Sequence, residues 1–452
     1  MKRLLSVPKV NENTLSHYVT LLASRRSRRF AKGLRLDGGP LAYDSKKAIQ
    51  PLTPEEVAIL AFAGAGVTGY LAADLPYKNG KEPASGDGNV MYSLLGRTAA
   101  SADGHNNCTL FVMNDEGTWM IRRPQNFRKS EIPALLGLLK KRDMLALFDK
   151  MAIRLDEKRR DIAEREVPFI LPFNKWSANR PGTTYFVPVN ELSSVYLTVL
   201  FFIFGRETGY NVLDDRNGYK SPGISRFTKS KGGWLHDDIR AGKTFTLSFV
   251  ETYICEMVAV EQGLMHQNLM LAAEALNLGA FPHYAGHPFA WTKALGFRHQ
   301  DMKLSEIMAK GRITTAAMDV LGKNESIPVP IGLENGDEVL LKPYSPPYYK
   351  DMREAVEAYV AFKYSKKDGA FRDGSNYNAW KSSKKIQEGI PDYSEETKDA
   401  VVSYLEYIFG RYGRIPANSG PFKTILAQQA HKIDTDFYDK YYKPGIYEER
   451  HS

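Results

Sequence analysis

The stretch HQNLMLAAEALNLGAFPHYAG, residues 266–286, decides the expected fold. It forms the second half of an apolar segment that predicts one long helix, beginning near Thr244 and stopping at Gly279. Apolar residues recur there at three- and four-residue spacing, the period of a helix with a wide buried face. Gly279 comes just past the last periodic residue, where a C-cap needs positive φ, and Pro282 keeps the helix from resuming. Without tandem heptads, such a helix predicts the spine of a domain or of a dimer rather than a coiled coil.

Composition places the chain among ordinary globular proteins. With 452 residues, 43% of them hydrophobic and 25% charged, it can bury a substantial core in two or three domains. The net charge of +9 is spread along the chain, so it permits anionic ligands without requiring nucleic acid.

Targeting signals and cysteine usage point to the cytoplasm. Cys108 and Cys255 are far apart in apolar surroundings, which suggests neither a metal site nor a redox pair. The N-terminus has basic residues but no apolar h-region, so we expect no secretory signal. The longest apolar run, residues 195–204, is far shorter than the ~20 residues that a membrane span needs.

A basic pentad, Arg25-Arg26-Ser27-Arg28-Arg29, follows a short amphipathic helix. Such a run is typical of a solvated face, a targeting tag or a nucleic-acid contact. At the end of a helix it is also suited to a phosphate, because guanidinium groups match phosphate oxygens bidentately.

Two local motifs are better explained by helix capping and helix ends than by a binding site. Thr53, Pro54 and Glu56 form a capping box for the helix that follows. The glycines that end this helix, at positions 64, 66 and 69, match the spacing of a dinucleotide fingerprint, but that fingerprint must follow a strand and open a helix. We therefore reject a Rossmann site.

Two hairpins are expected, one over residues 109–122 and one over 327–344 with Asn335-Gly336 at its turn. The small, polar segment 100–107 before the first hairpin either admits a flat ligand or is merely a connecting loop.

Asp149–Glu166 is heavily charged and predicts a solvated helix. The polar stretch 208–227 suggests a lid or substrate loop. Residues 344–452 are expected to be helical and rich in aromatic side chains.

Three segments in order resemble the nitroreductase-like FMN-dependent flavoprotein superfamily. The pentad resembles the Arg-Arg-Ser-x-Arg signature that holds the FMN phosphate and ribityl chain. Residues 100–106 (ASADGHN) resemble a Pro-Ser-x-x-Asn-x-Gln segment lying against the isoalloxazine. Residues 267–286 resemble the dimer-interface helix and the loop whose backbone faces flavin N5. The long spacing between the first two segments is most similar to the azoline (thiazole/oxazole) dehydrogenase branch.

The resemblance implies an α+β, three-layer fold, with a mixed, mainly antiparallel sheet flanked by helices. It implies a nitroreductase-like FMN-binding domain over residues 1–343, with an insertion near 125–240, and a helical, aromatic-rich C-terminal extension over 344–452. It also implies a homodimer with FMN at the interface and the spine helix at the two-fold axis.

The implied activity is an FMN-dependent oxidoreductase acting on a small molecule or peptide, with NAD(P)H or the substrate as electron donor. The implied cofactor-binding residues are Arg25, Arg26, Ser27, Arg29, Ser101, Ala102, Gly104, Asn106, Gln267, Asn268, Tyr284, Ala285 and Gly286. The nearest candidates for proton delivery are His283, Tyr284 and His287. His283 and His287 are spaced for a helical metal pair, but Pro282 and Pro288 argue against a helix and no third ligand follows, so no metal site is expected.

The sequence departs from the family pattern in the second segment. Ala100, Gly104 and Asn106 stand where Pro, Asn and Gln are usual, so ring-edge contacts are weakened or rerouted. The usual C-terminal basic phosphate contacts have only Lys366, Lys367 and Arg372 as candidates. These departures favour an alternative function, a flavin-fold binding or scaffold subunit with little or no turnover.

Overall fold

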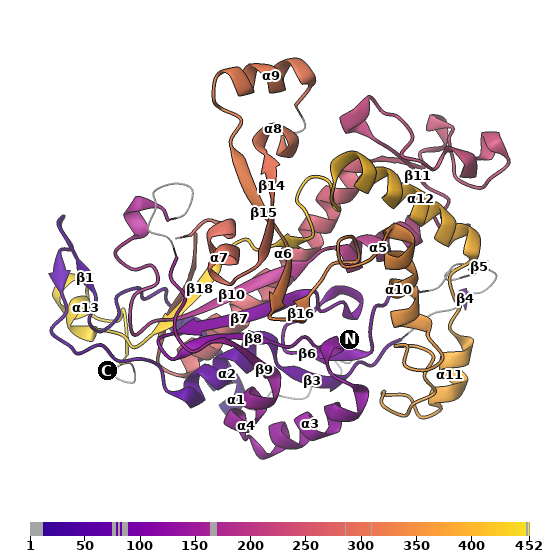
Figure 1. Cartoon of the computed structure of the whole chain (residues 1–452). Coiled ribbons are helices and arrows are strands. Elements are labelled where there is room, and N and C mark those ends of the chain that lie inside the picture. The colour runs from indigo at the N-terminus through magenta and orange to yellow at the C-terminus, as the bar shows by residue number, and fades with distance from the viewer. Residues whose placement is uncertain are drawn as a thin grey trace, which may run out of the picture.

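The computed structural model describes residues 12–74, 78–79, 82–83, 89–162, 170–284, 286–308, 310–448 and 451. Within these ranges the architecture is α+β (Figure 1). A seven-stranded sheet has the order β13-β18-β10-β7-β8-β9, with β17 paired to β10, and every pairing in it is antiparallel. The resemblance implied a mixed, mainly antiparallel sheet; an antiparallel sheet is present, and the described strands give it no parallel pair.

The central strands come from distant parts of the chain. Their bounds are β7 Cys108–Asn114, β8 Gly117–Ile121, β9 Ala152–Asp156, β10 Thr184–Glu191, β13 Gly279–His283, β17 Phe422–Lys423 and β18 Ala427–His431. β10 falls inside the expected insertion, and β17 and β18 fall inside the segment expected to be helical throughout. The description of 344–452 as purely helical is therefore wrong, because its last third supplies strands to the sheet.

One face of the sheet is covered by helices that share a core with it. α2 (Pro54–Ala65) and α6 (Leu247–Ala275) pack here, with α3 (Ile132–Lys141) and α4 (Met144–Met151) beside them. The Thr53 capping box closes α2 as expected: Glu56 N donates to Thr53 Oγ1 at 3.2 Å, and Thr53 N donates to Glu56 Oε2. Of the three glycines expected to end this helix, Gly66 is its C-cap, Gly64 lies within its last turn, and Gly69 lies in the strand that follows, β3 (Val67–Tyr70).

The opposite face carries α7 (Pro288–Ala294) and an antiparallel sheet of β14 (Arg298–Lys303), β15 (Ser326–Asn335) and β16 (Glu338–Leu341). Gly336 has φ +59° at the β15–β16 turn, which confirms the expected hairpin. β14, β15, α8 (Leu304–Ile307) and α9 (Arg312–Val320) form an arm that projects from the body (Figure 1).

A helical lobe adjoins the first half of α6. It consists of α5 (Ser193–Ile203), α10 (Met352–Tyr364), α11 (Ser383–Gly389) and α12 (Glu395–Tyr412). The C-terminal helix α13 (Thr435–Tyr441) lies instead at the opposite end of the molecule, beside β1 (Arg35–Leu36) and β2 (Tyr43–Asp44). The remaining short strands are β4 (Lys78–Asn79), β5 (Glu82–Pro83), β6 (Leu95–Arg97), β11 (Asn211–Leu213) and β12 (Thr244–Thr246), and α1 spans Glu12–Ser24.

The spine helix is slightly shorter than expected. Thr246 caps α6, its hydroxyl accepting a hydrogen bond from Phe249 N at 3.1 Å, so the residues before it form β12. At the other end the left-handed residue is Asn277, with φ +60°, and Gly279 already begins β13. Gly279 is needed for close packing: a Cβ there would lie 2.5 Å from His431 Nε2 and 2.7 Å from the Arg28 carbonyl.

The expected solvated helix over 149–166 is wrong. α4 ends at Met151, and β9 follows as an edge strand paired with β8; residues 163–166 lie outside the described part of the chain. Ile153 and Leu155 alternate with charged residues and pack on the sheet core. This two-residue period is that of a strand with one buried face.

Candidate functional site

The basic pentad divides into exposed and buried members. Arg26 and Ser27 are exposed, and Arg25 is half-buried. Arg28 is only 2% exposed and forms an ion pair with Glu274 at 2.8 Å. Arg29 is half-buried beside β13. Since the fourth and fifth members turn inward, only the first three face solvent, and the pentad is not a continuous solvated basic face.

Arg29 is a cation without an acidic partner. Its Nη2 donates to Asn174 Oδ1 at 3.1 Å and to Ser177 Oγ at 3.3 Å. Its guanidinium lies 5.2 Å from the Trp176 ring and 4.9 Å from the Phe281 ring. Nε is buried with no partner, and no carboxylate of the described residues lies within 4 Å. Burial lowers the pKa of Arg29, but an arginine stays charged in proteins. Its surroundings therefore suit an anionic group.

Two histidines lie beside this arginine in adjacent strands. His283 ends β13 and His431 ends β18. Burial, and secondarily the nearby Arg29 charge, lower the pKa of His283 to about 3. Burial also lowers the pKa of His431 to about 3. Both imidazoles are consequently neutral at pH 7, so His283 can offer a neutral N–H but not an imidazolium.

The loop after β13 borders a cavity of about 340 Å³. Its lining is mostly apolar and comprises Leu171, Tyr284, Gly286, His287, Pro288, Lys423, Thr424 and Ile425. Tyr284 is 58% exposed, and His287 is exposed with its ring 4.0 Å from Phe289. Ala285 lies outside the described residues.

Buried polar atoms remain unsatisfied next to this cavity. Thr424 Oγ1 and Trp291 Nε1 have no hydrogen-bond partner in the described part of the chain, although both side chains are at least 97% buried. A Cβ at Gly286 would lie 3.0 Å from that indole nitrogen, so glycine allows the loop to approach it. Buried polar atoms in native proteins are usually satisfied, and a bound polar ligand is one way to satisfy these.

The second segment turns its polar groups into the protein. Ser101 Oγ donates to Glu261 Oε2 at 2.8 Å and accepts from Asn106 N at 2.8 Å. Asn106 Nδ2 donates to the Leu95 carbonyl at 2.8 Å. Gly104 has φ +65°, and a Cβ there would lie 2.5 Å from the Ser93 carbonyl. Of the four candidate positions in this segment, only Ala102 is exposed.

The chain does not bring this segment to the first one. Glu261, which binds Ser101, and Glu274, which binds Arg28, are 13 residues apart on α6, or about 20 Å at 1.5 Å per residue. The helix candidates lie between them: Gln267 is exposed, and Asn268 Nδ2 donates to the Thr98 carbonyl at 3.0 Å. The first and third segments therefore converge, whereas the second occupies a separate place.

Several residues around Arg29 were missed by sequence reasoning. Tyr185 OH donates to Gln429 Oε1 at 2.8 Å, and the Gln429 amide lies 3.1 Å from His431 Nδ1. Tyr185 lies in β10, whereas Gln429 and His431 lie in β18. This strand, not the segment 366–372, is the C-terminal element beside the pentad. Lys367 and Arg372 lie in the helical lobe at the other end of the molecule. A short polar strand such as AQQAH has no strong local signal.

A buried lysine lies behind the second segment. Lys363 is fully buried and donates to the Asn89 carbonyl and to Tyr393 OH. Burial lowers its pKa well below the usual lysine range. His105 lies close by, its Nε2 2.8 Å from Thr198 Oγ1, and burial lowers its pKa to about 4. The helical lobe thus contacts the second segment through the hydrogen bond between Thr198 of α5 and His105.

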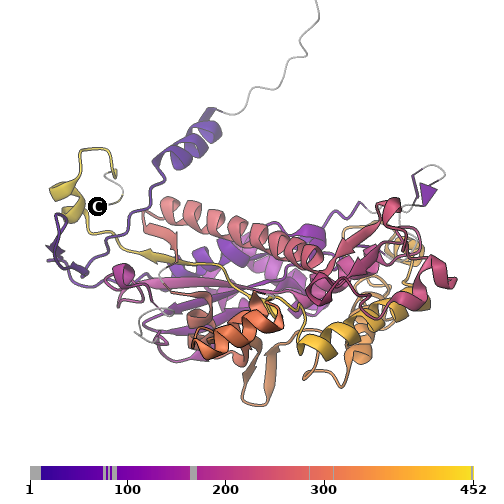
Figure 2. The ribbon, with the colours of Figure 1, turned by 90° about the horizontal axis from the view of Figure 1, so that it is seen from above.

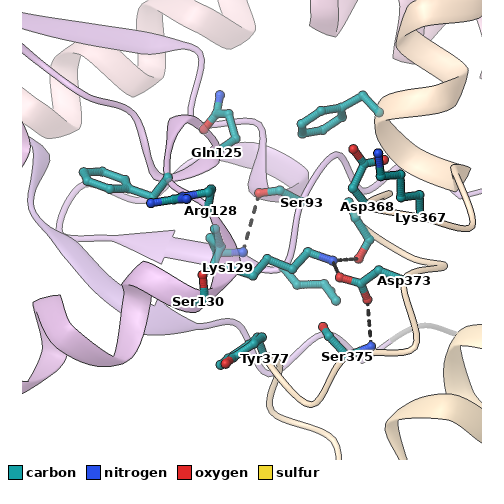
Figure 3. Close-up of a pocket in the computed structure, with 15 residues that line it drawn as sticks. Ser93, Gln125, Arg128, Lys129, Ser130, Lys367, Asp368, Asp373, Ser375 and Tyr377 are labelled. Carbon is teal, nitrogen blue, oxygen red and sulfur yellow. Dashed lines mark hydrogen bonds and ion pairs between the residues drawn. The ribbon is translucent and has the colours of Figure 1, made fainter.

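A second cavity, of about 380 Å³, lies between the helical lobe on one side and β6 with the segment before α3 on the other (Figure 3). Leu94, Leu95, Phe127 and Phe362 supply apolar walls. Lys129 crosses it to form an ion pair with Asp373, whose other oxygen accepts from Ser375 N at 3.0 Å. Lys129 and Asp373 neutralise each other within the protein. This cavity is therefore less suited to a charged ligand than the surroundings of Arg29.

Comparison with known proteins leaves the family open. No family model matches the chain, and no curated protein matches it. A solved structure of a putative nitroreductase from Ralstonia eutropha JMP134 is similar over 66% of this chain and 89% of that chain, with 14% sequence identity and a TM-score of 0.26. At this identity and score, the similarity assigns no function to the chain.

The described residues show neither a cluster of metal-ligating side chains nor a helix that could span a membrane. They contain no group of three or more His, Cys, Asp or Glu side chains that could hold a metal ion. None of their helices combines the length and the apolar character that crossing a bilayer requires.

Proposed function

We propose that this chain binds FMN and acts as a nitroreductase-like oxidoreductase, with the architecture of the azoline dehydrogenase branch. One observation carries the proposal: Arg29, a half-buried cation with no acidic partner among the described residues, lies over Phe281, a few residues before the loop that borders the 340 Å³ cavity. From Phe281 to His283, the last residue of β13, the strand advances by about 7 Å, and Tyr284 of the loop follows. A five-carbon ribityl chain with its phosphate can cover much of that distance.

The residues present fit such a ligand at both ends. Arg25, Arg26, Ser27 and Arg29 would bind the phosphate, because arginine forks and a hydroxyl suit its oxygens. The backbone of Tyr284–Gly286 would face the ring, and the apolar cavity wall would exclude water from it. Bound FMN would supply hydride or electron transfer at its N5.

Proton delivery would fall to the exposed side chains of the loop. Tyr284 and His287 line the cavity, whereas His283 is buried and neutral and would act only as an N–H donor. The electron donor would be NAD(P)H or the substrate itself, and the substrate a small molecule or a peptide.

An exposed apolar stripe along α6 supports a homodimer. α6 exposes Phe249 (54%), Tyr253 (47%), Val260 (64%) and Leu264 (39%) at spacings of four and seven residues, which place them on one stripe. Figure 2 shows α6 at the edge of the body, with its outer side uncovered along much of its length. A second copy packed on this stripe would bury it. Ser101, Ala102, Gly104, Asn106, Gln267 and Asn268 would then lie near the interface, where they could contribute to the partner's ring site.

The visible absorption spectrum of the purified protein tests this function. We expect flavin bands after FMN is supplied, and bleaching of these bands on anaerobic addition of NADH, NADPH or a substrate. Protein that stays colourless with excess FMN would refute the proposal.

The second segment favours an alternative, a flavin-binding scaffold with little or no turnover. Ser101 and Asn106 are engaged within the chain, which leaves fewer groups to tune the ring. Stoichiometric FMN that neither nicotinamide reduces, and that no substrate reduces, would support this alternative.

A further inference from the structure

Arg28 stands at the position of the pentad to which the family signature assigns no role. All three nitrogens of its guanidinium donate hydrogen bonds within the protein. Nη1 pairs with Glu274 Oε2 at 2.8 Å, Nη2 donates to the Ser24 carbonyl at 3.0 Å, and Nε donates to the Ile446 carbonyl at 2.9 Å. Arg28 therefore anchors the pentad to two other parts of the chain, the end of α6 and the C-terminal tail.

Glu274 receives a second partner from the tail itself. His451 Nε2 lies 3.0 Å from Glu274 Oε1. Because a carboxylate can only accept, Nε2 carries the proton of this hydrogen bond, and Nδ1 lies 3.0 Å from Glu448 N and 3.3 Å from the Glu448 carbonyl. The side chains of Arg28, Glu274 and His451 are all at most 2% exposed.

Apolar packing joins the same two ends of the chain. Phe30, Ala31 and Leu34 form a small core with Ile433, Phe437 and Tyr438. Phe30 N donates to Tyr438 OH at 3.0 Å. In Figures 1 and 2, α13 (yellow) lies beside the first residues after α1 (indigo), at the end of the molecule away from the helical lobe.

We propose that the C-terminal tail is a strap that positions the arginine pentad for the phosphate of the cofactor, with Glu274 and His451 as its positioning residues. The inference rests on the proposed function. Neither residue would touch the ligand; they hold Arg28, and through it the backbone that carries Arg25, Arg26 and Arg29. Ordering this segment before binding removes an entropic cost that binding would otherwise bear.

The test compares His451→Leu with His451→Gln in the full chain, using FMN and riboflavin as probes. Glutamine keeps an N–H donor for Glu274, and leucine removes it. We expect His451→Leu to weaken FMN binding by about tenfold or more, the size of one lost charge-assisted hydrogen bond, and riboflavin binding by less than about twofold because riboflavin has no phosphate. His451→Gln should bind both as the wild type does. If His451→Leu weakened the binding of FMN and riboflavin equally, or weakened neither, the proposed role of the tail as a strap would be refuted.

Amide hydrogen exchange provides a second readout that needs no flavin. His451→Leu should speed exchange over residues 25–31 and leave β7 and β8 unchanged, and His451→Gln should restore slow exchange. Unchanged exchange in the leucine variant would also overturn the strap. If the wild type took up neither flavin, the proposed function would fall and exchange alone would decide the role of the tail.

Discussion

The hydroxyl of Ser101 donates a hydrogen bond to Glu261 at 2.8 Å, so the middle of the spine helix holds the second segment directly. The other oxygen of this carboxylate accepts from Cys108 N at 2.8 Å and pairs with Arg97. Arg97 and Glu261 are both nearly inaccessible to water. One buried glutamate thus joins α6, the second segment and the start of β7.

Removal of this carboxylate should therefore be costly. Glu261→Ala leaves Arg97 buried without a counter-charge, which typically costs about 3–5 kcal/mol. Urea unfolding measures the loss. Glu395→Ala is the matched control, because its ion pair with Lys398 is largely exposed on the glutamate side and such pairs contribute little. Similar stability changes in the two variants would contradict the buried role of Glu261.

Arg29 should dominate the affinity for FMN. Arg29→Ala removes the cation beside the cavity loop, and we expect affinity to fall by about 10- to 100-fold, as for the loss of one or two charge-assisted hydrogen bonds. Flavin fluorescence quenching measures it. Arg35→Ala is the control, because Arg35 pairs with Asp37 on the exposed β1. If both variants bound FMN alike, Arg29 would not hold the phosphate.

The buried imidazoles predict a loss of stability in acid. Burial lowers the pKa of His105 to about 4, and of His283 and His431 to about 3, so the unfolded chain binds more protons than the folded one below about pH 6.5. The stability that these three neutral histidines contribute is therefore fully present above that pH and is lost progressively as the pH falls toward 4. Each group contributes up to about 1.4 kcal/mol per pH unit.

Urea unfolding at pH 7, 6 and 5 tests this slope. His283→Asn should reduce the slope between pH 6 and 5 by about one proton, since asparagine does not titrate. A wild-type stability that does not change from pH 7 to 5 would mean that these imidazoles are hydrated or protonated in the folded protein.

The spine helix should carry the dimer contact. Val260→Asp puts a charge into the exposed apolar stripe of α6 and should convert a dimer to a monomer in analytical ultracentrifugation, because a buried unpaired charge is strongly unfavourable in an interface. Ile313→Asp is the control: Ile313 is 89% exposed on α9 of the projecting arm, outside the stripe. A protein that stays dimeric with Val260→Asp but becomes monomeric with Ile313→Asp would place the interface on the arm instead.

Local signals in the sequence predicted much of the fold. The capping box at Thr53 and the turn at Gly336 each depend on residues a few positions apart, and both are present. β9 and β18 were missed because short strands with charged or polar residues take their stability from their neighbours in the sheet. The site was only partly predictable for the same reason. Arg29 and Phe281 were both within segments that were singled out, but their proximity depends on β13 pairing with β18, about 150 residues away.

Gly279 should be the least replaceable glycine of the spine region. A Cβ there would lie 2.5 Å from His431 Nε2 and 2.7 Å from the Arg28 carbonyl, so Gly279→Ala forces the strand away from both the pentad and β18. We expect a loss of about 1–3 kcal/mol, as for overpacking in a rigid core, together with weaker FMN binding. Gly410→Ala is the matched control, because Gly410 is exposed within α12 and its Cβ would meet nothing within 4 Å. That change should stabilise the protein by about 0.5–1 kcal/mol through helix propensity. If Gly279→Ala unfolded at the same urea concentration as the wild type, the close approach of β13 to Arg28 and His431 would be wrong, and with it the placement of Arg29 beside the cavity loop.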